Sequence, residues 1–236
     1  MPTAAFTVAD YVGLACYAAA WLSYYLMVER SEAGRRSLNR VINAHRYHWM
    51  RGVVGRENRI VDANINASLQ NGTAFFASTS LLAIGGTLTL LRSTDEVLTI
   101  FAEMPLGFAT TRLAWEMKVI GLTIIFVYAF FKFAWSYRLF NYGAILIGAI
   151  PNPGPETSRA EMELAAWRAA SMNTVAGRHF NRGQRAFFFA LAYLGWFVSA
   201  YVLMASTAAV LFVMWRRQFA SDALAALGRG PWPPPP

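Results

Sequence analysis

Four stretches of the chain are almost entirely apolar, and they set the expected architecture. They cover residues 8–28, 74–91, 113–133 and 186–214. Each reaches roughly 18 residues, the length that a helix needs to cross the hydrocarbon layer of a bilayer at about 1.5 Å per residue. The pattern therefore predicts four transmembrane helices in a single membrane domain over residues 1–236.

The connections between these stretches also have a helical period. Residues 29–73 and 134–185 each predict a basic amphipathic helical hairpin, either lying in the lipid head groups or packed together as a solvated layer. The connection over residues 92–112 predicts a short helix that ends before Pro105 and rests on the outer surface. The chain ends in PWPPPP, which predicts an unpacked polyproline II segment of open role.

Composition supports a membrane protein. The chain is 56% hydrophobic and 15% aromatic, and only 14% of its residues are charged. Such values do not fit an ordinary soluble domain. The expected class is an all-α, polytopic membrane protein.

The charged residues predict an orientation in the membrane. The formal net charge is +8, but most arginines lie in residues 29–73 and 134–185, where membrane topology rather than nucleic-acid binding accounts for them. By the positive-inside rule both connections are cytoplasmic, so that four spans leave both termini outside. Arg216 and Arg217 follow the last span and oppose this assignment.

Polar residues begin the second span. Asp62, Asn66, Gln70 and Thr73 fall on one side of a helix, and Asn64, Ser68 and Asn71 fall on the other. A helix that is polar on two sides cannot face lipid. It either extends into the cytoplasm or packs among other helices as a hydrogen-bonded core.

Lys118 and Lys132 are the only lysines in a chain rich in arginine. Both are expected to reach the two membrane surfaces with their long side chains. The alternative is that their shared helix face, with Asp62 or Glu116 as counter-charges, lines an internal polar site for an anion or a proton.

Catalytic and cofactor-binding motifs do not stand out in the sequence. No phosphate-binding loop, nucleophile motif or set of paired carboxylates is recognisable, and the one cysteine, Cys16, falls inside the first span. His45, His48 and His179 fit interfacial positions better than a metal site. No cofactor, metal site or catalytic residue is expected.

Six motifs are distributed over nearly the whole chain: Trp49-Met50, Arg56 to Asp62, Phe75-Phe76-Ala77-Ser78-Thr79, Trp115-Glu116-x-Lys118, Phe126 to Phe133 with Asn141-Tyr142, and Phe180 to Arg185. Together they resemble an uncharacterised family that is catalogued as domain of unknown function 599. The resemblance implies a bacterial multi-pass protein and implies no activity. The expected location is the bacterial inner membrane, with both termini periplasmic by the charge pattern.

Two sets of side chains are the candidate sites. The candidate polar membrane site contains Glu57, Asp62, Asn66, Glu116, Lys118, Lys132, Arg138, Asn181 and Arg185. The candidate lipid-headgroup contacts are Arg35, Arg36, Arg40 and Arg51.

Three functions follow from these patterns. The favoured one is an accessory or scaffolding subunit of a larger membrane complex that contacts anionic lipid. The alternatives are a small transporter or channel that uses the intramembrane Lys, Asp and Glu residues, and a membrane enzyme that acts on a lipid-borne substrate. The expected partners are the bilayer, anionic lipids, and either another membrane protein or further copies of the chain.

Overall fold

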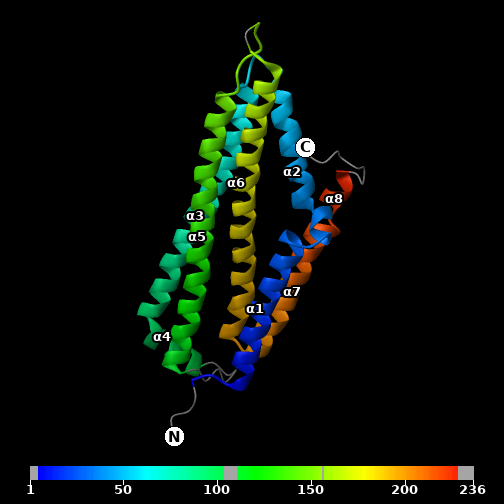
Figure 1. The fold of residues 1–236 in the computed structure, drawn as a ribbon. Helices are drawn as coiled ribbons and strands as arrows, with labels where there is room; N and C mark the ends of the chain where they lie inside the picture. Colours follow the sequence, from blue (N-terminus) through cyan, green and yellow to red (C-terminus); the bar gives the residue numbers. More distant parts are fainter. Residues whose placement is uncertain (1–4, 104–110, 156, 228–236) are drawn as a thin grey trace.

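The protein is all-α in residues 5–103, 111–155 and 157–227, the part of the chain that its computed structural model describes (Figure 1). Its longest helices are α3 (Ile60–Arg92), α5 (Arg112–Gly148) and α6 (Arg159–Leu194). α6 packs against α5 on one side, with α3 beyond it, and against α2 (Leu38–Val53) and α7 (Ala200–Phe219) on another. The shorter elements are η1 (Ala33–Arg36), α4 (Thr94–Glu103), η2 (Gly195–Phe197) and α8 (Asp222–Ala226). Pro105 and the proline-rich tail lie outside the described residues.

Three helices are long and apolar enough to cross a membrane: α1 (Val8–Glu29), α3 and α5. At 37 residues α5 is about 55 Å long, nearly twice the hydrocarbon thickness of about 30 Å. α3, at 33 residues, and α5 are therefore both longer than a single membrane crossing requires. In Figure 1 α1 and α7 lie beside the lower part of α6, and α2 lies beside its upper part.

The expected cytoplasmic hairpins are mostly continuations of the long helices. α5 runs without a break from the predicted third span into residues 134–148, and α3 already begins at Ile60. Asp62 and Asn66 are buried there, so the polar start of α3 extends the span and also packs as a core. The separate amphipathic helix is α2, whose buried Met50 and Val53 pack on alanines of α6.

The helix expected over residues 186–214 is divided, which corrects the sequence prediction. α6 ends at Leu194, η2 follows, and α7 begins at Ala200 after the extended residue Ser199, whose side chain accepts a hydrogen bond from the Val202 backbone N–H. A Cβ on Gly195 would lie 2.9 Å from the carbonyl oxygen of Val202, so the absence of a side chain allows the tight reversal.

α1 and α7 pack side by side and point in the same direction. Gly13, near the start of α1, lies against Ala200 and Leu203 at the start of α7. Near the other ends, the Tyr24 hydroxyl donates to the carbonyl oxygen of Met214 at 3.3 Å. The two helices therefore cover the same depth of the bundle.

The face of α3 that packs on α5 is polar and narrow. Thr73 and Ser80 donate their hydroxyls to carbonyl oxygens one turn back in α3, and Thr123 of α5 donates to Thr87 at 2.8 Å. Small side chains that bond within their own helix let two helices approach closely in a membrane. The buried residues of this face are Asp62, Asn66, Thr73, Ser80 and Thr87, the last four at intervals of seven.

Candidate functional site

Three groups of charged side chains that pair with one another lie at different levels along the bundle. One level lies at the end with α4 and η2, a second where α1 ends and α2 begins, and a third near the junction of α2 and α3. The nine residues of the candidate polar site are distributed over all three levels. The middle level contains a pocket.

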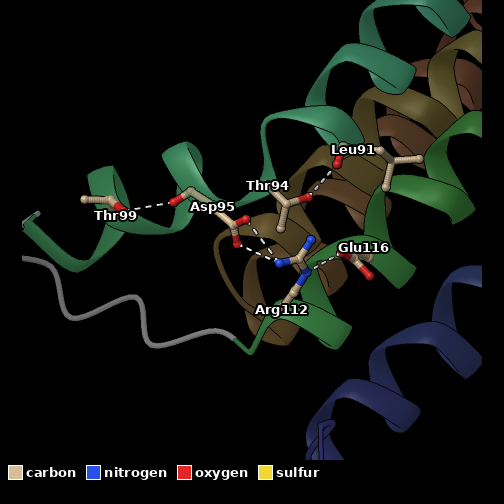
Figure 2. Close-up of polar contacts among 6 residues, drawn as sticks. All are labelled: Leu91, Thr94, Asp95, Thr99, Arg112 and Glu116. Atoms are coloured by element: carbon tan, nitrogen blue, oxygen red, sulfur yellow. Dashed lines mark hydrogen bonds and ion pairs between the residues drawn. The ribbon is translucent and has the colours of Figure 1, made fainter.

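At the α4 level, Arg112 joins the start of α5 to α4 (Figure 2). Its Nη1 donates to Asp95 Oδ1 at 2.8 Å and its Nε donates to Glu116 Oε1 at 2.8 Å. All three side chains are at least partly exposed, so screening by water weakens these pairs. Glu116 thus pairs with Arg112 and belongs to a surface network.

Lys118 also lies at this level, but it is buried. Its Nζ donates to the carbonyl oxygen of Trp196 at 2.8 Å and lies 5.2 Å from the centre of the Trp196 ring. The Trp196 indole N–H donates in turn to Asp10 Oδ1 at 2.7 Å. Through these two contacts, Lys118 attaches the turn between α6 and α7 to α5, and Asp10 attaches the same turn to α1.

At the α2–α3 junction, Asp62 is fully buried and shares one oxygen between two donors. Its Oδ1 accepts from the Trp49 indole at 2.7 Å and from Arg56 Nη1 at 2.5 Å, while Glu57 beside it is exposed. One turn on, Asn66 donates to the carbonyl oxygen of Phe140 at 3.1 Å.

Asp62 and Lys118 are far apart. Phe140 follows Lys118 by 22 residues in α5, or roughly 33 Å along the axis, and Asp62 lies a further turn beyond that contact. Asp62 is paired with Arg56, and Glu116 with Arg112. The structure does not bring the candidate counter-charges to Lys118.

The middle level is built around Glu29, the last residue of α1. Arg182 donates to both carboxylate oxygens of Glu29, at 3.1 and 2.5 Å, and Arg185 donates to Oε1 at 3.2 Å. The side chains of Arg185 and Glu29 are only 6% and 14% exposed, so water screens this pair little. The Arg185 guanidinium also lies 5.2 Å from the Tyr24 ring and 5.8 Å from the Tyr25 ring.

Beside this cluster, α2, α6 and α7 enclose a small pocket of about 90 Å³. Arg217 lies at its edge, with its guanidinium 4.9 Å from the centre of the Phe188 ring. Gln218 is 7% exposed, and its Nε2 has no hydrogen-bond partner among the described residues. The lining residues are Tyr24, Leu38, Asn39, Asn181, Gln184, Arg185, Phe188, Met214, Arg217 and Gln218.

Further cations surround the middle level. Lys132 lies over the Tyr128 ring at 5.0 Å. Burial lowers the pKa of His179, and the nearby charges of Lys132 and Arg182 lower it further, which reflects a positive local potential. Burial also lowers the pKa of Arg46 on α2 to about 10.

The other predicted cations are exposed. Arg138 donates its Nε to the Tyr142 hydroxyl at 2.6 Å. Arg35 forms an exposed ion pair with Glu32 at 3.0 Å. The exposed headgroup candidates are Arg35, Arg36, Arg40 and Arg51.

Histidines do not form a metal cluster in the described residues. No group of three or more His, Cys, Asp or Glu side chains is placed there to hold a metal ion. The middle level contains guanidinium and amide groups, which bind anions.

Four important residues of the middle level were not among the sequence candidates: Glu29, Arg182, Arg217 and Gln218. Glu29 and Arg182 are 153 positions apart, and no local pattern could pair them. The sequence did draw attention to Arg217, because Arg216 and Arg217 follow the last predicted span and oppose the expected topology.

A family model described as "Protein of unknown function, DUF599" matches residues 12–223. The chain therefore belongs to this family. No curated protein and no solved structure matches the chain.

Proposed function

We propose that this member of the DUF599 family is an accessory membrane protein that engages anionic lipid through the cations of its middle level. In this proposal the membrane is the bacterial inner membrane, and the middle level lies at its cytoplasmic surface. The observation that carries the proposal is the excess of arginine at this level, since Glu29 is shared by Arg182 and Arg185 while Arg217 forms no ion pair among the described residues. Basic clusters at this depth attract anionic head groups.

The proposed topology has five crossings: α1, the adjacent parts of α3 and α5, the end of α6, and α7. α7 runs parallel to α1 over the same depth, which supports a fifth crossing. Arg216 and Arg217 then lie on the cytoplasmic side, as the positive-inside rule requires. The N-terminus would be outside and the end of α7 inside, in place of two periplasmic termini.

An accessory role fits this arrangement better than transport does. Between the levels of Lys118 and Glu29, the bundle is packed with apolar and aromatic side chains such as Tyr17, Phe189 and Tyr193. Lys118 is held by Trp196, and Lys132 lies over Tyr128, so each lysine has its own local contact. These contacts favour anchoring roles for both lysines.

Labelling of introduced cysteines tests the topology. In a Cys16→Ser background, a membrane-impermeant maleimide applied to spheroplasts is expected to label Ala5→Cys and to leave Ala223→Cys unlabelled until the membrane is permeabilised. Both positions lie just outside the helices that cross at each end. Equal labelling of both before permeabilisation would restore the four-span topology and contradict the fifth crossing.

Native mass spectrometry tests the accessory role. Protein extracted from its own membrane in a mild detergent is expected to carry a larger protein partner and to retain anionic lipid over zwitterionic lipid. Replacing the exposed Arg35, Arg36, Arg40 and Arg51 by glutamine should reduce this preference, whereas replacing Arg92, at the end of α3 next to α4, should not. A chain that carries neither a partner nor an excess of anionic lipid would contradict the proposal.

A further inference from the structure

We propose that the pocket at the middle level is a specific site for the phosphate of an anionic lipid head group. This inference rests on the proposed function and deepens it, because it assigns the lipid contact to one pocket rather than to the basic surface as a whole. The pocket is formed by α2, α6 and α7, with Tyr24 of α1 at its edge.

The lining of the pocket has the chemistry that a phosphate requires. It contains two guanidinium groups, Arg185 and Arg217, and none of its lining residues is acidic. The side-chain amides of Asn39, Asn181, Gln184 and Gln218 add neutral donors. A phosphodiester binds through such charge-assisted and amide hydrogen bonds.

Two features show that this chemistry is available to a ligand. The Arg217 guanidinium lies over the Phe188 ring and makes no ion pair in the described part of the chain, so its N–H groups can donate to a ligand. Gln218 is 93% buried at the pocket, and its Nε2 lacks a partner among the described residues. A buried donor without a partner is costly, and a phosphate oxygen would satisfy it.

The charge count also favours an anion. Glu29 supplies one negative charge, while Arg182, Arg185 and Arg217 supply three positive charges. Two positive charges remain unbalanced around the pocket. A phosphodiester carries one negative charge and reduces this excess without displacing Glu29.

A second pocket indicates that the phosphate belongs to a lipid. It shares Arg217 with the first pocket and is lined by Phe212, Val213, Arg216, Arg217, Ala220, Ser221 and Asp222. Phe212 and Val213 are 60% and 47% exposed on α7 and offer an apolar path to an acyl chain. The carboxylate of Asp222 disfavours a phosphate in this second pocket, so the head group is directed to the first.

Lipid titration by native mass spectrometry tests the site. The purified full chain is titrated with phosphatidylglycerol and with phosphatidylcholine of the same acyl length. Arg217→Gln is expected to weaken binding of one phosphatidylglycerol by about tenfold, the effect of losing one charge-assisted hydrogen bond. Gln218→Leu should weaken it as well. Arg178→Gln, the matched control, removes the same charge from an exposed position on α6 outside both pockets and should leave this binding unchanged.

The other outcomes overturn the proposal in distinguishable ways. If Arg217→Gln and Arg178→Gln weaken binding equally, lipid is held by the basic surface only, and the proposed function survives without the site. If inorganic phosphate or glycerol phosphate at millimolar concentration displaces the lipid, the pocket serves a soluble anion. If the unmodified chain does not prefer phosphatidylglycerol, the proposed function fails as well. Circular dichroism of each variant must match that of the unmodified chain.

Discussion

Glu29→Gln is expected to lower the free energy of unfolding by about 3 kcal/mol, because it leaves two arginines without their shared carboxylate. Arg185 is 6% exposed and Arg182 is 24% exposed at the side chain, so water can replace the lost partner only in part. Thermal unfolding in detergent, followed by tryptophan fluorescence, should show a midpoint roughly 5–10 °C lower.

A neighbouring glutamate provides the matched control. Glu32 pairs with Arg35 at a similar distance, but their side chains are 80% and 72% exposed. Glu32→Gln should therefore cost no more than roughly 0.5 kcal/mol. Comparable losses in the two variants would mean that the Glu29 cluster is as well hydrated as a surface pair, and its role in joining α1 to α6 would have to be abandoned.

A second substitution should recover part of the stability that Glu29→Gln loses. If the penalty comes from an uncompensated buried cation, then Glu29→Gln combined with Arg185→Met recovers part of the stability. If the penalty came only from lost packing, the two losses would add. The double variant thus shows whether the destabilisation comes from an unpaired buried charge or from lost packing.

The sequence was sufficient for the all-α architecture and for the three helices that are long and apolar enough to cross a membrane. Long apolar runs identify α1 and the apolar parts of α3 and α5 without reference to the rest of the chain. The fourth prediction failed because Gly195 and Ser199 interrupt an otherwise apolar run. The reversal there is fixed by Trp196, which bonds to Asp10, 186 positions away. Apolar periodicity does not report such a contact.

The face of α3 that packs on α5 could not be identified from the sequence. Thr79, Ala83 and Thr87 have the spacing of a helix contact, yet Thr79 and Ala83 are only half-buried, and the buried series runs through Thr73, Ser80 and Thr87. Both sets have helical periods. Only the position of α5 decides between them, and that position depends on contacts such as the one from Asn66 to the carbonyl oxygen of Phe140.

The candidate site was only partly predictable for a similar reason. Charged residues in apolar surroundings were correctly recognised as costly, but their partners were not. Glu29 of α1 meets Arg182 and Arg185 of α6, and Asp62 meets Trp49 and Arg56. The first of these contacts arises from tertiary packing, which a single sequence does not encode locally.

Gly183→Ala is expected to destabilise the bundle by about 2 kcal/mol, although alanine is the better helix former. A Cβ at this position of α6 would lie 2.7 Å from the Cε1 and Cζ atoms of Phe133. Phe133 is fully buried, with its ring stacked on Phe76 at 5.3 Å and in edge contact with Phe180 at 5.6 Å. Since the ring cannot move away without disturbing its neighbours, α6 must shift from α5.

Gly86→Ala is the matched control, because Gly86 lies within α3 and its Cβ would meet no atom within 4 Å. There the substitution should stabilise the protein by roughly 0.5–1 kcal/mol through helix propensity alone. Thermal unfolding of the two variants should thus shift in opposite directions. A rise in the midpoint of Gly183→Ala would mean that the contact between α5 and α6 at Phe133 is looser than 2.7 Å implies, and that the close approach of these helices does not depend on glycine.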